Sequence, residues 1–364
     1  MGPRSRREDP ETACRVLAHF IETCKTPDDP KLELWLCDFL WNLRLVRPEA
    51  ALGLQRQILS RFLPKMATGL MRQLESKERN VRASARFGLL TVKRTELEAA
   101  AIAFDIDLTK PEFLRADGRR YYESFLLCPR LGGSQRLILS MVGEDRQVNA
   151  ALAVRAFFDQ FDVDLFILLG VAAGLQTHTN LGDVVCATSV VDVEGGRLEK
   201  LRPLFRPVHA NITKHLKRDL EHFDPYRVGW ADALTKGVAA FDRSRYDIPT
   251  ATAKWRPKFS TAHLASGEKL IVDDSLPDTR VAFGEQIRAR EMEAAGFCSA
   301  CEDIPRPWMV FRGVADFGTA ESKDQPTKDG EDRKAWQAPA ALAAATACRL
   351  FLTTEYAIDG EVSF

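Results

Sequence analysis

The sequence has no long hydrophobic run and no excess of charge of either sign. None of its apolar stretches reaches the roughly 18 residues that a membrane-spanning helix needs. Its 51 lysines and arginines balance 51 aspartates and glutamates, so no net field steers the chain towards nucleic acid or an anionic membrane. The first residues, MGPRSRREDPE, lack the apolar segment of a secretory signal. We therefore expect a cytoplasmic protein that contacts neither membrane nor nucleic acid.

Histidine is scarce, and most cysteines are far from one another in the sequence. Both features argue against a metal site. There are six histidines and eight cysteines. Only Cys298 and Cys301 form a C-x-x-C, and no second pair of ligands follows at the spacing that zinc requires. Scattered cysteines in apolar surroundings are typical of buried thiols in a reducing compartment. We expect no metal and no cofactor.

The 364 residues, of which 45% are hydrophobic, are enough for more than one core. From Pro10 to Ser84, apolar residues recur at three- and four-residue spacing, and prolines separate the runs. We interpret residues 1–84 as a module of three or four helices. It contains no catalytic constellation, so we assign it to oligomerisation or to docking of a regulatory partner. A catalytic domain is expected at residues 85–358.

Buried-strand patterns alternate with amphipathic helices after residue 86. FGLLTV is followed by the helical KRTELEAAAIAF with Thr95 as a candidate N-cap, and NAALAVRAFFDQF leads into the apolar DLFILLGVAAGL. This alternation predicts an α/β fold with a mixed, largely parallel sheet. Between residues 194 and 260, basic and aromatic residues interleave with proline, a pattern that fits either a lid over a nucleotide or an oligomer contact.

Three ionisable residues fall in the mostly apolar stretch from Met292 to Asp316. Glu293 lies in an apolar helical pattern that runs to about Ala300, and Arg312 and Asp316 lie at the carboxyl end of a short buried-strand pattern. Open α/β sheets bind ligands at the carboxyl ends of their strands. The alternative is a helix–strand unit with a structural Arg–Asp pair.

Six motifs in order resemble the nucleoside phosphorylase and nucleosidase superfamily. They are FGLLTVKRTELEA, NAALA followed by LLGVAAGL and LGDVV, SGEKLI, MEAAGF, FRGVADFG and WQAPAALAAATA. The resemblance covers residues 86–355 and is nearest to the hydrolytic branch, which includes methylthioadenosine/S-adenosylhomocysteine nucleosidase. The chain also resembles the nucleosidase effector domains of bacterial phage-defence systems. The resemblance implies a three-layer α/β/α fold around a mixed sheet, in a homo-oligomer.

The resemblance also implies a role for each charged residue. Asp316 corresponds to the acid that protonates purine N7, and Arg312 to an arginine that pairs with a carboxylate and orders the site. Glu293 corresponds to the glutamate that accepts hydrogen bonds from both ribose hydroxyls, a geometry that a carboxylate can satisfy. Glu96 corresponds to the carboxylate that activates water, with Glu98 as the alternative. The other expected substrate contacts are Met292, which packs on the ribose face, Leu270 and Ile271 of SGEKLI, Val171, Ala172 and Phe317.

Two departures from the family pattern bear on the reaction. Phosphorylases hold phosphate with an arginine and a serine around the glycine turn, whereas here Leu168–Gly174 contains no cation. Binding phosphate without a charged partner is unfavourable, so we expect water as the nucleophile. Lys93 and Arg94 replace an apolar surface near the 5′ substituent, which favours an anionic 5′ group. The alternative is that both cations face solvent.

We therefore predict a purine N-ribosyl hydrolase that releases adenine from an adenine nucleotide, such as AMP or ATP, or from a nucleoside. One alternative is a purine nucleoside phosphorylase with an unrecognised phosphate site. Another is a catalytically silent nucleotide-sensing module. The joint presence of Glu293, Arg312 and Asp316 argues against silence, because binding alone does not require an acid at N7.

Overall fold

The computed structural model describes residues 83–111, 113–114, 118–194, 196–199, 202–246, 248–249, 252, 255–268, 284–318 and 328–357. The chain separates into two units between residues 82 and 83, and every described element belongs to the second unit. The helical module predicted at residues 1–84 therefore lies outside the described residues, apart from its last two. Its existence and its role stay predictions.

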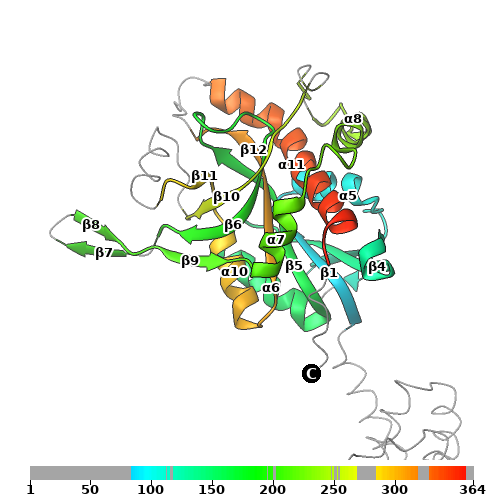
Figure 1. Ribbon diagram of the computed structural model, residues 1–364, viewed down its shortest axis with the longest axis horizontal. Helices are drawn as coiled ribbons and strands as arrows, with labels where there is room; N and C mark the ends of the chain where they lie inside the picture. The colour runs from blue at the N-terminus through cyan, green and yellow to red at the C-terminus, as the bar shows by residue number, and fades with distance from the viewer. Residues whose placement is uncertain are drawn as a thin grey trace, which may run out of the picture. The chain divides into compact units, whose positions relative to one another are not determined.

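Ten strands of the described residues form one mixed sheet (Figure 1). Its order is β11-β10-β6-β12-β5-β1-β4-β3-β2, and β9 pairs with β6. β1 is parallel to β4 and β5, and β12 is parallel to β5 but antiparallel to β6. The strands are β1 (Ala83–Thr91), β2 (Phe113–Leu114), β3 (Arg120–Cys128), β4 (Gly133–Met141), β5 (Phe161–Gly174), β6 (Val184–Asp192), β9 (Val208–Asn211), β10 (Phe259–Ser266), β11 (Ile287–Glu291) and β12 (Trp308–Asp316).

Helices cover both faces of this sheet and make three layers (Figure 1). α5, α8 and α11 pack together, and α6 packs on α10. Neighbouring residues of β1 identify the two faces, because side chains alternate along a strand. Phe87 contacts Tyr356, just after α11, whereas Gly88 faces Phe157 of α6. The helices are α5 (Arg94–Phe104), α6 (Gln147–Gln160), α7 (Lys214–His222), α8 (Trp230–Ala240), α10 (Ala294–Asp303) and α11 (Lys328–Thr354).

Two glycines let these layers approach closely. A Cβ atom at Gly313 of β12 would overlap the backbone of Ala340 in α11. On the opposite face, a Cβ atom at Gly296 of α10 would overlap the backbone of Gln147 in α6. Side chains larger than hydrogen at these positions would push a helix away from its neighbour. The close packing holds the elements that carry the site in fixed positions.

The predicted α/β fold with a mixed sheet and three layers is confirmed. Two local predictions are wrong. Thr95 is not the N-cap of α5; Lys93 is, because its extended backbone precedes the first helical residue. Glu293 is not inside a helix but is the N-cap residue of α10. The segment at residues 194–260 contains a hairpin of β7 (Gly196–Glu199) and β8 (Arg202–Phe205), which projects away from the main sheet (Figure 1).

Candidate active site

The charged residues singled out in the sequence lie at or just after the carboxyl ends of neighbouring strands. Gly170 of β5 lies opposite Arg312 of β12 in the sheet register, and Asp316 lies opposite Ala173. β1, which precedes the turn whose N–H groups bind Glu96 of α5, pairs with the other side of β5. The end of β5 also pairs with β11. Residues from four separate parts of the sequence therefore surround one edge of the sheet.

Arg312 is the centre of the cluster and is only 1% exposed. Its Nη2 atom lies 2.5 Å from Glu291 Oε2 and 3.2 Å from Glu293 Oε2. Burial by itself lowers the pKa of a guanidinium, but the charges of Glu291, Glu293 and Glu96 outweigh burial and raise the pKa of Arg312. A buried cation with paired carboxylates is stable only while those partners are present. The expected Arg–carboxylate pair is thus present, with two partners.

Glu291 is a site residue that the sequence reasoning missed. Its carboxylate accepts hydrogen bonds from the backbone N–H groups of Glu293 at 3.0 Å and Ala294 at 2.9 Å. It therefore satisfies donors at the start of α10 while it holds Arg312. The signal was available in the sequence as E-M-E, where Glu291 and Glu293 flank Met292. Because Arg312 was expected to pair with a carboxylate, Glu291 could have been considered as its partner.

Glu293 is buried next to two other carboxylates. Its Oε1 atom accepts a weak hydrogen bond from the backbone N–H of Arg146 at 3.4 Å. Burial and then repulsion by Glu291 raise the pKa of Glu293 to about 8, with a further contribution from Glu96, against the opposing effect of Arg312. The raised pKa favours the protonated form of this carboxyl group at neutral pH. A protonated carboxyl group can donate one hydrogen bond and still accept others.

Glu96 is held by three backbone N–H groups. Oε2 accepts from Val92 at 2.8 Å and Lys93 at 3.0 Å, and Oε1 accepts from Val171 at 3.0 Å. The carboxylate thus joins the turn after β1 to the end of β5. Val171 was predicted to contact substrate, and its N–H donates to Glu96.

Gly170 explains how Glu96 and Arg312 can approach each other. A Cβ atom at Gly170 would overlap Arg312 Nη1 and lie 2.5 Å from Glu96 Oε1. The space above this small residue is filled by two site side chains. Glu98, the alternative to Glu96, lies elsewhere and binds Arg94, Arg245 and Tyr246.

Asp316 ends β12, just after an irregularity in its pairing with β5. Its Oδ1 atom accepts a hydrogen bond from Gly318 N at 3.0 Å, in a turn where Gly318 has a φ of 65°. Glycine adopts this left-handed conformation without a steric penalty. The turn therefore fixes one oxygen of Asp316 at the edge of the sheet, and the half-buried Phe317 lies within it. The half-buried Met292 lies between the two glutamates of the cluster.

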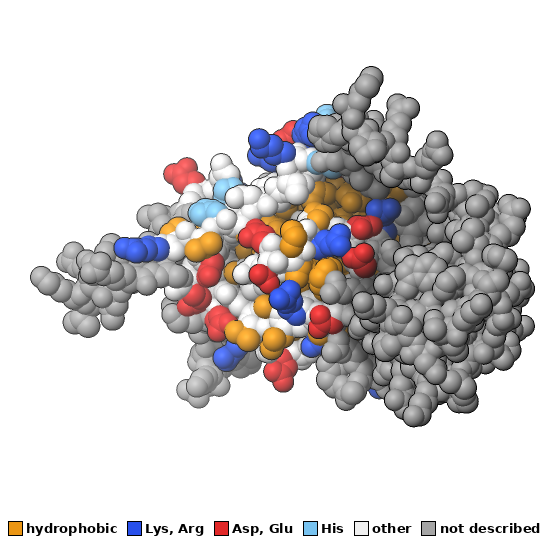
Figure 2. Space-filling view, turned by 90° about the horizontal axis from the view of Figure 1, so that it is seen from below, with side chains coloured by type: hydrophobic (Ala, Val, Ile, Leu, Met, Phe, Trp, Pro, Cys, Tyr) orange, Lys and Arg blue, Asp and Glu red, His pale blue; other side chains and the backbone are white. Residues whose placement is uncertain are grey.

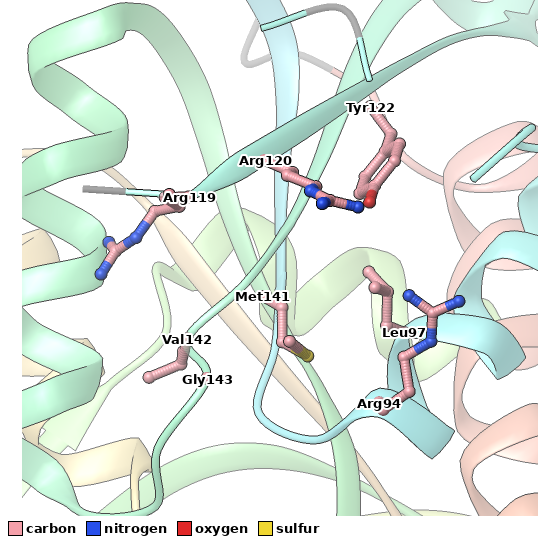
Figure 3. Close-up of a pocket in the computed structure, with 9 residues that line it drawn as sticks. Arg94, Leu97, Arg119, Arg120, Tyr122, Met141, Val142 and Gly143 are labelled. Carbon is pink, nitrogen blue, oxygen red and sulfur yellow. The ribbon is translucent and has the colours of Figure 1, made fainter. Parts of the chain in front are cut away.

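The two cations predicted at the 5′ end both have carboxylate neighbours. Lys93 Nζ lies 3.5 Å from Asp145 Oδ2, and Arg94 Nε lies 2.7 Å from Glu98 Oε1. Arg94 also lines a cavity of about 380 Å³, shown in Figure 3. Leu270 and Ile271, the residues expected at the adenine edge, lie outside the described residues.

The described cysteines are buried thiols, as expected. All five are free, and burial raises the pKa of each thiol. In the described ranges, no group of three or more histidine, cysteine, aspartate or glutamate side chains has the arrangement of a metal site. The same residues include no helix with the length and apolar character of a membrane span. The face shown in Figure 2 mixes acidic and basic side chains with hydrophobic ones.

The fold and this site together define an α/β protein with a buried carboxylate–arginine cluster at the carboxyl ends of strands in a mixed sheet, the position where open α/β sheets bind ligands. Comparison with protein families makes the class specific. The family model described as the phosphorylase superfamily matches residues 93–353. The chain belongs to the phosphorylase superfamily.

Two curated relatives are nucleosidases. The chain is 26% identical over 243 residues to an ATP nucleosidase of Escherichia coli (strain KTE188), an alignment that covers 65% of this chain and 46% of the relative. It is 25% identical over 193 residues to a 5′-methylthioadenosine/S-adenosylhomocysteine nucleosidase of Mycobacterium bovis, covering 52% of this chain and 72% of the relative. The chain thus spans about half the length of the ATP nucleosidase.

Solved structures show the same fold at lower identity. Futalosine hydrolase of Helicobacter pylori superposes with a TM-score of 0.53 and 15% identity, covering 74% of this chain and 97% of the hydrolase. A methylthioadenosine/S-adenosylhomocysteine nucleosidase of the same organism gives a TM-score of 0.52 and 17% identity, covering 74% of this chain and 99% of the nucleosidase. At 15% and 17% identity, these similarities show the fold alone.

Proposed function

We propose that the chain is a purine N-ribosyl hydrolase that releases adenine from an adenine nucleotide or nucleoside. The observation that carries the proposal is the convergence of Glu96, Glu293, Arg312 and Asp316 at one edge of the sheet, with Glu291 completing the buried cluster. The names of the two curated relatives, an ATP nucleosidase and a methylthioadenosine/S-adenosylhomocysteine nucleosidase, support the same reaction and the same base.

In the proposed reaction, the bond between ribose C1′ and purine N9 breaks while water forms a bond to C1′. Positive charge develops on the ribose ring and negative charge on the base. Asp316 donates a proton to purine N7, and Glu96 accepts a proton from the water. A positioned acid of this kind is worth roughly 10² to 10⁴ in rate. The products are adenine and a sugar with a hydroxyl group at C1′.

Glu293 binds the ribose hydroxyls in this proposal, and Arg312 holds its position. Three carboxyl groups around one guanidinium leave an excess of negative charge in the cluster when all of them are ionised. Because negative charge stabilises an oxocarbenium-like sugar, ionisation of Glu293 favours the transition state. Its raised pKa means that a substrate hydroxyl first meets a carboxyl group that is largely protonated at neutral pH.

Water is the proposed nucleophile because the phosphate site of a phosphorylase lacks its cation here. The guanidinium that faces Gly170 belongs to Arg312, and Glu291 and Glu293 already pair with it. A phosphate ion near Gly170 would meet Glu96 and this neutralised arginine, an unfavourable environment for a doubly charged anion. Phosphorolysis and catalytically silent nucleotide binding are the two alternatives.

A panel of adenosine, methylthioadenosine, AMP and ATP tests the proposal. Chromatography of the products should show free adenine, with phosphorylated substrates preferred because basic residues lie beside the site. A preference for methylthioadenosine over every phosphorylated substrate would contradict the nucleotide assignment but keep the hydrolase. No adenine from any of the four would favour the silent binding module.

The proposal also covers the oligomeric state, the cellular location and the biological role of the protein. We extend the proposal to a homo-oligomeric effector of bacterial phage defence that acts in the cytoplasm by destroying adenine nucleotides. Two pairs of exposed hydrophobic side chains support self-association: Phe125 and Leu127 of β3, exposed by 62% and 66%, and Val148 and Leu152 of α6, exposed by 64% and 59%. Light scattering of the full chain tests the oligomer, and a monomer over the working concentration range would exclude it.

A further inference from the structure

A basic cavity lies beside the start of α5, and Arg94 is the one residue of its lining that the sequence predicted to contact substrate. Its volume is about 380 Å³, and α5, the start of β3 and the end of β4 form its walls. A water molecule's share of volume is about 30 Å³, so the cavity is large enough for a chain of phosphates. Among the described residues that line it there are three arginines, Arg94, Arg119 and Arg120, and no aspartate or glutamate.

Figure 3 shows how these arginines lie. The side chains of Arg94 and Arg120 extend to the side of the cavity where Tyr122 and Leu97 lie, whereas Arg119 points the opposite way. Arg94 comes from α5 and Arg120 from β3, so the two guanidinium groups approach the cavity from different walls. Planar guanidinium groups bind phosphate oxygens in pairs of hydrogen bonds.

The contacts of these two arginines leave donors for a ligand. Arg94 uses Nε in its contact with Glu98, and not its two terminal nitrogens. Glu98 is held in turn by Arg245 Nη1 at 3.0 Å and by the hydroxyl of Tyr246. These contacts hold the carboxylate with which Arg94 pairs, beside the cavity that Arg94 lines. Within the described residues, no carboxylate lies at ion-pair distance from Arg120, whose side chain is exposed.

The cavity is joined to the candidate active site by two backbone hydrogen bonds. Val142 N donates to Thr91 O at 2.7 Å, and Gly143 N donates to Val92 O at 3.3 Å. These bonds tie the cavity wall to the end of β1 and to Val92, whose N–H donates to Glu96. The same loop continues to Arg146, whose N–H contacts Glu293. A substrate whose ribose lies at Glu293 would therefore have the cavity beside it.

From this arrangement we infer that the cavity is the subsite for the polyphosphate chain of an adenine nucleotide, with Arg120 and Arg94 as the cations that bind it. The inference rests on the proposed function, because it takes the ribose to be bound at Glu293. Arg120, which no sequence motif singled out, is then a specificity-determining residue. The subsite favours a triphosphate over a nucleoside, because each guanidinium adds contacts that only the phosphates can make.

Binding of inorganic tripolyphosphate to the full chain tests the subsite without catalysis. Calorimetry should show that wild type binds it and that Arg120→Gln binds it about 10- to 150-fold more weakly, the effect of losing one charge-assisted contact. Arg227→Gln is the matched control, because it removes one positive charge from a side chain that is 86% exposed and outside the cavity. Thermal melting of all three proteins checks that they fold. Equal binding by wild type and Arg120→Gln, or none by wild type, would overturn the inference.

Kinetics connect the cavity to the substrate. Tripolyphosphate should inhibit adenine release from ATP competitively, and Arg120→Gln should lower the ratio of kcat/KM for ATP to kcat/KM for adenosine at least about tenfold. Non-competitive inhibition, or an unchanged ratio, would place the anion outside the substrate path and overturn the assignment. If wild type releases no adenine from any substrate, the proposed function fails, whereas the binding measurement still decides whether the cavity holds an anion.

Discussion

Replacing Glu293 by glutamine removes the carboxyl group that is buried beside Glu291, Glu96 and Arg312. The native state raises its pKa from 4.5 to about 8. Between these two values, the folded protein holds a proton that the unfolded chain has released, so stability is lost as the pH rises through this window. Each unit of pKa difference corresponds to about 1.4 kcal/mol. Over the whole window, the free energy of unfolding therefore falls by on the order of 5 kcal/mol.

Denaturation of wild type and Glu293→Gln at about pH 5 and about pH 9 measures this effect. Glutamine is uncharged, like the protonated glutamic acid, so the two proteins should have similar stability at the lower pH. At the higher pH, wild type should be the less stable, with a melting temperature lower by roughly 10 °C, since about 1 kcal/mol shifts the midpoint by roughly 2–4 °C in a domain of this size class.

Glu302→Gln is the matched control because Glu302 lies exposed on the same helix, α10. It should show the same pH dependence as wild type, since the buried Glu293 is unchanged in it. If Glu293→Gln and wild type differ by the same amount at both pH values, the carboxyl group does not titrate in this window. The description of Glu293 as a repelled, mostly protonated group would then be wrong.

Three further outcomes are expected. Asp316→Asn should abolish adenine release while nucleotide binding persists, and turnover like that of wild type would remove Asp316 from the mechanism. Gly170→Ala should lower stability by about 1–3 kcal/mol and reduce activity, because the added methyl group displaces Arg312 or Glu96; melting and activity both like wild type would refute this. Truncation near Ser84 should keep the catalytic fold but change assembly or control, and light scattering and activity that both match the full chain would refute that role.

Much of the fold could be predicted from sequence because its signals are local. Buried strands such as β5 are continuous apolar runs, and α6 has an amphipathic period. The residue at which a helix begins depends on backbone hydrogen bonds that a sequence does not show. Lys93 becomes the N-cap of α5 because Glu96 accepts its N–H. Glu293 precedes α10 because Glu291 accepts the first free N–H groups of that helix.

The site was predicted less completely, because its contacts join distant parts of the chain. The motifs gave Glu96, Arg312 and Asp316, but not that Glu291 shares the arginine with Glu293. Nor did a sequence pattern suggest Arg120, since its relation to Arg94 arises only when β3 packs near α5. The filled space over Gly170 is likewise a tertiary contact. Residues paired through the sheet register become neighbours only after folding.

The identity of the nucleophile at C1′ decides between hydrolysis and phosphorolysis. Wild-type protein incubated with ATP should release adenine and a sugar bearing a C1′ hydroxyl in equal amounts, at the same rate in phosphate-free buffer as with added phosphate. That result is expected because Glu96 and the paired Arg312 occupy the space over Gly170 where a phosphorylase would need a cation for phosphate. Adenine release that requires phosphate and yields a sugar phosphorylated at C1′ would contradict hydrolysis and establish a phosphorylase.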